Sequence, residues 1–378
     1  MRCERVHLDG TVRSRAAQET WDAITPHLPR YGITRVSRLT GLDYLGMPVW
    51  TAIRPTARTL SASQGKGAND LLAKISAVVE AIELWHVEQP MIPALHAPAN
   101  DLDLPFPLSG LPVKFWHEDL VHLPLEWTTG TQLLSGTPVP VPLALVQRTA
   151  RRAPWQPDVF RATSTGLACG NNRDEALLHA MYEVVERDAL NADESANGRW
   201  RLRIDPASVG APYARQLIDG LLATGAALEL ALVANAYSIP VCLAYLWTED
   251  YPVHFAGAGC HQDPVIALTR AITEAAQSRL TCIAGTRDDL VSHEEAFDAD
   301  PPRPPAATDL RPWAETVDGC EPWRGGFHDQ AQAVAARIER VTHYEPVFLD
   351  LSAAEEPLAA VKVICPGTRS RVRRSIPR

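Results

Sequence analysis

The chain contains the stretch Thr165-Gly-Leu-Ala-Cys-Gly-Asn-Asn-Arg-Asp-Glu-Ala-Leu-Leu-His-Ala-Met-Tyr-Glu-Val-Val-Glu-Arg-Asp188. Its glycine-rich beginning is typical of a turn, and the spacing that follows predicts a long helix over residues 172–191. Asn171 or Asn172 is a credible cap, and acids in the first turn suit the helix dipole. Further side chains share one face of this helix, with Arg187 beside them: Glu175, His179, Glu183 and Glu186.

A second glycine-rich stretch, Ser61-Ala-Ser-Gln-Gly-Lys-Gly67, precedes a helix that we expect over residues 68–89. Ser76, Glu80 and Glu83 fall at positions i, i+4 and i+7, within one narrow sector of this helix. An apolar stripe lies next to them, so the carboxylates occupy the edge of the buried face. An unpaired charge in that place is costly.

A third stretch, Ala256-Gly-Ala-Gly-Cys260, precedes a helix expected over residues 263–284, which opens with an aspartate cap and a proline. Arg270, Glu274 and Gln277 share a face of this helix. Any one acidic pair is typical of a solvated helix surface, because glutamate is a good helix former. Three helices that repeat the same pattern indicate a shared site.

Carboxylates that converge on one place repel one another, so such a cluster requires cations. Mg²⁺ suits it because this ion prefers oxygen ligands, retains waters and accepts substrate phosphates. No Cys or His ligand set with the spacing of a zinc or iron site occurs in the sequence. Basic side chains for a triphosphate stand near the three helices: Lys66, Arg187, Arg270 and Arg279. The Gly-Lys-Gly run lacks the spacing of a P-loop.

The remaining sequence interleaves strands and helices without regular βαβ spacing, which predicts a mixed α+β fold. Residues 127–136 are expected to form two short strands around a turn, and residues 298–305 a proline-rich exposed excursion. Further expected elements are helices at 16–28 and 329–342 and strands at 33–36, 47–53, 125–127, 139–145, 228–233, 241–246, 347–351 and 361–365. We divide the chain into an N-terminal α/β segment (1–60), a core (61–295), the excursion (296–328) and a C-terminal α/β segment with a basic tail (329–378).

The composition of the chain indicates what it binds and the compartment in which it resides. The net charge of −9 argues against a nucleic-acid-binding surface. The seven cysteines form no Cys-x-x-Cys pair, which favours a reducing compartment, and none is predicted to act as a covalent catalyst. No apolar run reaches membrane-spanning length, so we expect a cytoplasmic protein with no membrane contact.

Taken together, the three motifs resemble the signatures of the YcaO family. These are Ser76-x-x-x-Glu80-x-x-Glu83, the segment from Ser164 through Glu183-Val-Val-Glu186-Arg187-Asp188, and the segment from Gly259 through Glu274-Ala-Ala-Gln277-Ser-Arg279. Three ordered motifs over roughly residues 30–290 are more specific than any one of them.

The resemblance implies a YcaO-type fold, with mixed sheets packed by long helices that converge on a non-P-loop site for ATP and Mg²⁺. By that resemblance the metal ligands would be Glu80, Glu83, Glu183, Glu186 and Gln277. ATP would be contacted by Lys66, Ser76, Asn171, Arg187 and Gln277, with Glu175, Glu274 and Arg279 as additional candidates. Family chemistry is ATP-dependent activation of a peptide backbone amide for attack by a nucleophile.

The segment Tyr31–Val49 and the Gln64-Gly-Lys-Gly67 run look most like the branch of the family that is paired with TfuA proteins and forms thioamides. Azoline-forming members often end in Pro-x-Pro-x-Pro, whereas this chain ends Arg373-Arg-Ser-Ile-Pro-Arg378. The resemblance therefore implies a thioamide product in a ribosomally made peptide or protein, a TfuA-like partner and a homodimer. Two alternatives stay open: an azoline-forming cyclodehydratase acting on Cys, Ser or Thr, and an ATP-binding accessory protein for a sulfur-inserting enzyme.

Overall fold

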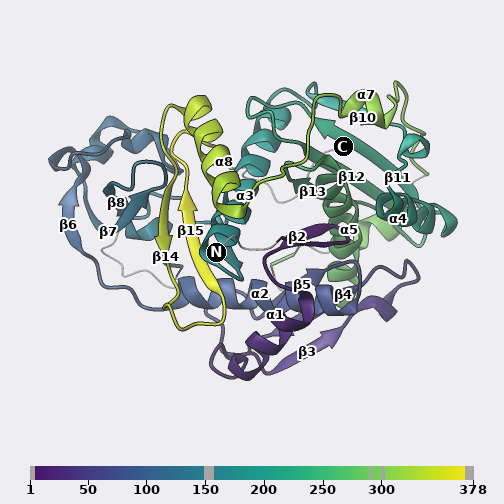
Figure 1. Ribbon diagram of the computed structural model, residues 1–378, viewed down its shortest axis with the longest axis horizontal. Helices are drawn as coiled ribbons and strands as arrows, with labels where there is room; N and C mark the ends of the chain where they lie inside the picture. The colour runs from purple at the N-terminus through teal and green to yellow at the C-terminus, as the bar shows by residue number, and fades with distance from the viewer. Residues whose placement is uncertain (1–4, 149–156, 288, 291–292, 299–302, 371–378) are drawn as a thin grey trace.

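The computed structural model describes residues 5–148, 157–287, 289–290, 293–298 and 303–370. Part of the proline-rich tract and all but two residues of the basic tail lie outside these ranges. The chain combines long helices with several antiparallel sheets, which confirms the predicted α+β class (Figure 1). The helices are α1 (Ala17–Ile24), α2 (Asp70–Glu88), α3 (Arg173–Ser195), α4 (Pro212–Ala223), α5 (Pro264–Ala284), α6 (Glu294–Asp298), α7 (Trp313–Thr316) and α8 (Phe327–Thr342).

The strands form four separate sheets within the described residues. A hairpin joins β1 (Val6–Leu8) and β2 (Thr11–Arg13), and a second sheet has the order β3 (Arg35–Arg38), β4 (Val49–Ile53), β5 (Ala62–Lys66). A third has the order β10 (Arg201–Ile204), β11 (Ala227–Val233), β12 (Val241–Thr248), β13 (Tyr251–Cys260). The fourth has the order β6 (Leu95–Pro98), β7 (Pro124–Gln132), β14 (Val347–Asp350), β15 (Ala359–Ile364), β9 (Leu167–Gly170), and β8 (Pro138–Pro142) also pairs with β7.

Residues 127–136 were expected to form two strands around a turn, and that expectation is wrong. The first strand, β7, runs unbroken to Gln132, and its partner β8 begins only at Pro138. The strand keeps an unbroken register with β8 from Trp127 through Thr131, and the turn lies beyond it at residues 133–137.

The long helices begin where their capping residues predict. The side chains of Asn69, Asn172 and Asp263 accept hydrogen bonds from backbone N–H groups of the first turn of α2, α3 and α5. These bonds satisfy donors that a helix leaves unpaired at its start. Of the two asparagines considered as the cap of α3, the structure selects Asn172.

The three glycine-rich stretches were expected to be turns, and the structure corrects this. Most of their length forms the strands β5 and β9 and the last part of β13, each at the end of its sheet's strand order, while Thr165 and Gly166, just before β9, form a turn as expected. Their glycines allow the following helix to lie directly against the strand. A Cβ at Gly65 would stand 2.0 Å from the backbone nitrogen of Ala77, and one at Gly257 would stand 2.2 Å from the carbonyl oxygen of Ala271.

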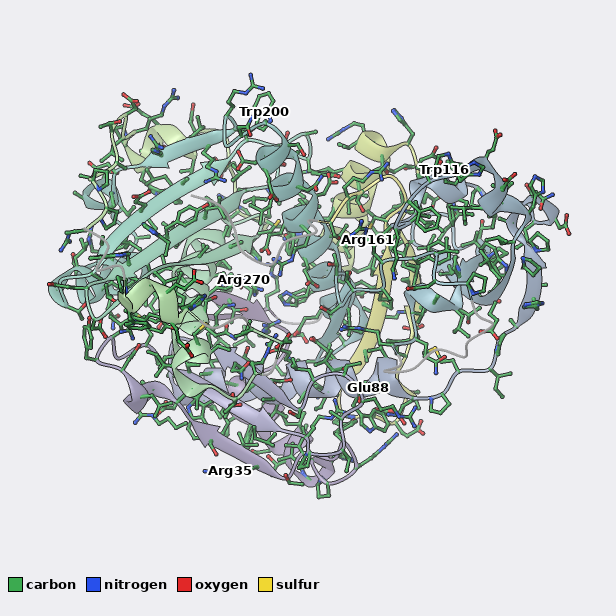
Figure 2. All side chains as sticks on the ribbon, turned by 180° about the vertical axis from the view of Figure 1, so that it is seen from behind. Arg35, Glu88, Trp116, Arg161, Trp200 and Arg270 are labelled. Carbon is green, nitrogen blue, oxygen red and sulfur yellow. The ribbon has the colours of Figure 1, made fainter. Side chains whose placement is uncertain are left out.

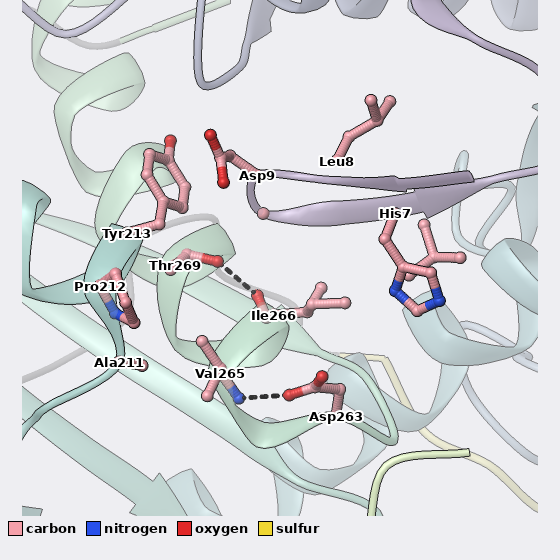
Figure 3. A pocket seen from close by; sticks show the side chains of 12 residues that line it. His7, Leu8, Asp9, Ala211, Pro212, Tyr213, Asp263, Val265, Ile266 and Thr269 are labelled. Carbon is pink, nitrogen blue, oxygen red and sulfur yellow. Dashed lines mark hydrogen bonds between the residues drawn. The ribbon is translucent and has the colours of Figure 1, made fainter. Parts of the chain in front are cut away.

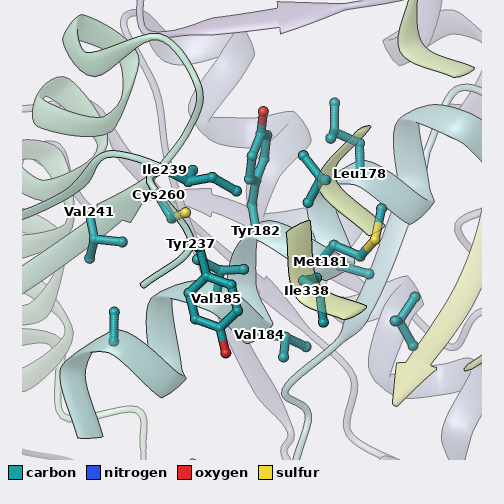
Figure 4. Packing of buried hydrophobic residues seen from close by; sticks show 14 of the residues in the cluster. Leu178, Met181, Tyr182, Val184, Val185, Tyr237, Ile239, Val241, Cys260 and Ile338 are labelled. Carbon is teal, nitrogen blue, oxygen red and sulfur yellow. The ribbon is translucent and has the colours of Figure 1, made fainter. Parts of the chain in front are cut away.

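Helix α3 connects the two larger sheets through the core. On one side its apolar residues meet β15 and α8, and on the other they meet the segment before β12 and the end of β13. Figure 4 shows Met181 of α3 beside Ile338 of α8, in the same cluster as Val185 of α3 and Cys260 of β13. This packing holds α3 between the β10–β11–β12–β13 sheet and the sheet that contains β14 and β15, while α2 and the β3–β4–β5 sheet lie below them in Figure 1.

Candidate functional site

The acids of the three long helices follow one common spacing from their caps. The first set lies eleven residues after the cap of each helix and consists of Glu80 in α2, Glu183 in α3 and Glu274 in α5. Fourteen residues after the cap lies the second set, Glu83, Glu186 and Gln277. Because three residues is close to one helical turn, each helix presents its two members on the same face. The structure thus contains three copies of one unit: a glycine-containing edge strand, a cap and an acidic helix.

Members of the first set bind the edge strand of their own unit or, for Glu183, the residue just before that strand. Glu183 accepts a hydrogen bond from the backbone N–H of Gly166 at 3.1 Å, and Glu274 accepts one from Ala258 at 3.4 Å. Glu80 likewise accepts from the backbone N–H of Gln64. An edge strand leaves such N–H groups without a neighbouring strand, so the carboxylate of the next helix takes the neighbour's place.

Members of the second set reach the strand of the next unit. Glu83 of α2 accepts from the backbone N–H of Cys169 in β9 at 2.7 Å, and Gln277 of α5 donates to the carbonyl oxygen of Gln64 in β5 at 2.9 Å. Glu186 of α3 lies within electrostatic range of Cys260 in β13. The three units therefore close into a cycle that brings the acidic faces together.

The carboxylates of this cycle also interact electrostatically. Burial raises the pKa of Glu80 to about 7 and that of Glu186 to about 7. Burial also raises the pKa of Glu83 well above its ordinary value, and the charges of Glu80 and Glu183 add to the shift. Carboxyls with such raised pKa values lack full compensation by the surrounding charges.

Two predicted cations lie directly at the acids. Lys66, on β5, pairs with Glu274 at 2.7 Å. Arg187 lies 3.4 Å from Glu186 and 3.8 Å from Glu183. Although burial opposes it, the charges of Lys66 and Arg187 lower the pKa of Glu274, so this acid is ionised.

Arg270 occupies the position seven residues after the cap on α5, equivalent to Ser76 of α2 and His179 of α3. Burial raises the pKa of Glu186, and the charge of Arg270 opposes that shift. Arg270 also contributes to the lowered pKa of Glu274. Figure 2 shows Arg270 toward the interior of the molecule, in contrast to Arg35 and Trp200 at its periphery.

Two candidate residues lie at the beginning of α3. Asn171 accepts a hydrogen bond from Thr20 of α1 at 2.8 Å and donates to Glu175 at 3.4 Å. Glu175 is 1% exposed and binds the backbone N–H and hydroxyl of Ser14 as well as Arg13. These contacts join the N-terminal hairpin to α3.

The structure does not bring Arg279 to the acidic cluster. Its guanidinium, 1% exposed, binds Asp43 at 2.6 Å and Asp250 at 2.5 Å. Arg279 lies two residues beyond Gln277, which turns it to a different side of α5. Its contacts fasten the segment before β4 and the end of β12 to this helix.

The donor set fits Mg²⁺. It consists of carboxylates and one amide, which are hard oxygen ligands. Because the amide nitrogen of Gln277 is engaged by Gln64, its oxygen is the atom left for a ligand. Among the described residues, no three His, Cys, Asp or Glu side chains stand close enough to hold a metal ion by themselves.

Sequence reasoning missed three basic residues near the acids. Arg13 from β2 and Arg287 after α5 lie within electrostatic range of Glu83 and Glu80, respectively. Lys362 from β15 lies within range of Glu183. Only Lys362 carried a usable signal, because it interrupts the apolar run Ala359–Ile364 and a lysine buried there requires partners.

Two pockets of the described structure are lined by residues outside the acidic cluster. One, of about 280 Å³, is lined by the β1–β2 turn and the beginnings of α4 and α5, and Figure 3 shows Asp9 facing Tyr213 across it. The other, of about 350 Å³, lies between β7 and β14. None of the described helices is both long and apolar enough to span a membrane.

Residues 64–369 match the family described as YcaO cyclodehydratase, ATP- and Mg²⁺-binding. An uncharacterized protein of Mycobacterium tuberculosis is 39% identical over 289 residues, which cover 76% of this chain and 65% of that protein. This chain thus spans about two thirds of that relative's length. An uncharacterized protein from the tfuA 3′ region of Rhizobium leguminosarum bv. trifolii is 39% identical over 290 residues, covering 72% of this chain and 67% of that protein.

The fold is similar to that of the YcaO protein of Methanopyrus kandleri bound with AMPPCP and Mg²⁺. The two superpose with a TM-score of 0.74 at 21% identity, over 98% of this chain and 99% of that one. The family match spans all three acidic helices and the strands before α3 and α5. This chain therefore belongs to the YcaO family, as its three motifs predicted.

Proposed function

We propose that this chain uses Mg-ATP at the cycle of acidic helices to activate a peptide backbone amide, and that external sulfide then gives a thioamide. The observation that carries the proposal is the cycle of contacts that brings the acidic faces of α2, α3 and α5 together, where Glu80, Glu83, Glu183 and Glu186 are near one another and repel when ionised. Membership of an ATP- and Mg²⁺-binding family supports the identity of the ligand.

When bound, Mg-ATP supplies the phosphoryl group that converts the amide oxygen into a phosphate leaving group. The chain's own residues would position and neutralise rather than form covalent bonds. The acids of α2 and α3, with Gln277, would hold Mg²⁺ by oxygen atoms. Lys66, Arg187 and Arg270, already at the acids, would face phosphate oxygens. Ser76 lies one turn before Glu80 on the same face and would contact the nucleotide beside it.

Our proposal of sulfide as the nucleophile and of a TfuA-like partner is supported by sequence relatives and not by the geometry of the site. One relative is encoded in a tfuA 3′ region, and the Tyr31–Val49 segment resembles the TfuA-associated branch. The family's description as a cyclodehydratase favours a second candidate, an azoline former that uses a Cys, Ser or Thr side chain of the peptide as the nucleophile. In both cases the substrate is a peptide or protein, and we propose that the enzyme acts as a homodimer.

Mass spectrometry of a short peptide encoded beside this gene tests the proposal, after incubation with ATP, Mg²⁺, sulfide and the TfuA-like protein. We expect the mass change of one oxygen-to-sulfur exchange, and none without ATP. Loss of one water without sulfide or partner would establish the cyclodehydratase instead. ATP binding with no peptide-dependent turnover would indicate the accessory role.

A further inference from the structure

Lys362 is a buried ammonium that the proposed reaction has not used. It is 4% exposed, and its neighbours along β15 are all apolar. Ala360, two residues earlier and on the same face of the strand, packs against α2, whereas Val361 and Val363 pack against α3. A lysine in this place loses its hydration, so it persists only with partners.

The partners of Lys362 are backbone carbonyls of one short segment. Its ammonium donates to the carbonyl oxygen of Thr163 at 2.9 Å and to that of Thr165 at 2.7 Å. The next residue of β15, Val363, donates its backbone N–H to Gly166 at 2.7 Å. Three hydrogen bonds from two adjacent residues of β15 thus hold residues 163–166 on the strand.

This segment carries the donor that orients a proposed metal ligand. The backbone N–H of Gly166 binds Glu183 at 3.1 Å. Gly166 has φ = +79°, and a Cβ there would stand 2.2 Å from the carbonyl oxygen of Val363, so the segment can take this position only with glycine. Lys362 therefore acts on Glu183 indirectly: it binds the carbonyls of Thr163 and Thr165, and the adjoining Gly166 binds Glu183. The charge of Lys362 also lies within electrostatic range of that acid.

The burial of Lys362 is itself costly, which argues against a purely structural role. Burial lowers the pKa of Lys362 to about 8, although the charge of Glu183 opposes the shift. An apolar residue in the middle of a sheet would avoid this cost, since replacing buried charges with apolar groups is often neutral or stabilising.

We infer that Lys362 is a positioning residue for Glu183: by holding residues 163–166 on β15 it fixes the carboxylate in the orientation that Mg-ATP requires. This inference rests on the proposed function. Partners that orient a metal ligand commonly change metal affinity by about 10- to 100-fold when removed.

The experiment measures Mg-ATP affinity by calorimetry, and thermal unfolding without ligand, for the parent chain, Lys362→Met and the control Lys114→Met. Lys114 is an exposed lysine paired with Asp158. We expect Lys362→Met to bind Mg-ATP about 10-fold or more weakly while still unfolding cooperatively, and Lys114→Met to match the parent. If Lys362→Met does not fold, Lys362→Gln replaces it, because glutamine keeps a polar group but cannot bind both carbonyls. The expected loss of Mg-ATP affinity is the same, about 10-fold or more.

A purely structural lysine would give a lower unfolding temperature and unchanged affinity of the folded protein. Affinity equal to that of the parent in the folded variant therefore overturns the inference alone. Absence of Mg-ATP binding in the parent chain overturns the proposed function and this inference together.

Discussion

Helix α5 carries two clusters of charge that differ in how completely they are paired. At Arg279, one guanidinium binds Asp43 and Asp250, and Asp43 is as buried as its partner, with 2% of its side chain exposed. At Glu274, the same helix faces acids whose pKa values are raised by burial, among them Glu80 and Glu186. Burial raises the pKa of Asp43 too, so the two clusters differ in their contacts and not in the direction of the pKa shift. Arg279 binds Asp43 directly, whereas Glu80 and Glu83 are bound by backbone N–H groups and face other carboxylates. A direct ion pair indicates a structural role, whereas converging carboxylates indicate a place for a further cation.

The largest effect should come from breaking the closed cluster. Arg279→Met leaves Asp43 buried without its cation, and removing one partner of a buried pair costs about 3–5 kcal/mol of unfolding free energy. Urea unfolding measures this loss. The matched control is Arg215→Met, whose partner Asp219 is 65% exposed, and it should cost about 1 kcal/mol or less. Weakened Mg-ATP binding by a folded Arg279→Met at unchanged stability would instead place Arg279 in the site.

The acids near Glu274, among them Glu80 and Glu186, should make the stability of the protein depend on pH and on Mg²⁺. Folding raises the pKa of Glu80 and of Glu186 from 4.5 to about 7. The folded state therefore binds protons more tightly than the unfolded state, and stability present below pH 4.5 is lost as pH rises through about 7. Binding of Mg²⁺ and ATP should restore the lost stability. The rise in melting temperature on adding them should therefore be larger at pH 8 than at pH 5, because the pKa of Glu80, about 7, lies between these two pH values.

Measuring melting temperatures across this range with and without Mg-ATP checks the prediction, and Glu80→Gln should flatten the ligand-free curve. A ligand-free protein whose stability rises steadily over the same pH range would contradict the idea that these carboxylates are under-compensated.

The smallest effect is expected at the two cysteines of the cycle. Burial raises the pKa of the Cys169 and Cys260 thiols well above the ordinary value, so both stay neutral. Cys169→Ala and Cys260→Ala should leave peptide-dependent ATP turnover largely intact, because Cys169 serves Glu83 through its backbone N–H. Turnover abolished in either variant, with nucleotide binding retained, would indicate a thiolate or persulfide role.

Local signals in the sequence predicted the helices and their acidic faces well. Caps such as Asn172 and Asp263 mark the helix starts, and helical spacing alone places Glu80 beside Glu83. The edge strands were misread as turns because their glycines serve close packing on α2, α3 and α5, which no local pattern reveals. The partners of Arg279 could not be predicted either, since Asp43 lies 236 positions away along the chain.

The central claim is that Mg-ATP binds where the three acidic helices meet, and calorimetry of single-acid variants tests it most directly. The parent chain, Glu80→Gln and Glu183→Gln are titrated with Mg-ATP, with the exposed Glu118→Gln as the control. Since the two acids come from different helices and both face the cluster, each substitution should abolish or strongly weaken binding, while the control matches the parent. Unchanged Mg-ATP affinity in both Glu80→Gln and Glu183→Gln would contradict the account.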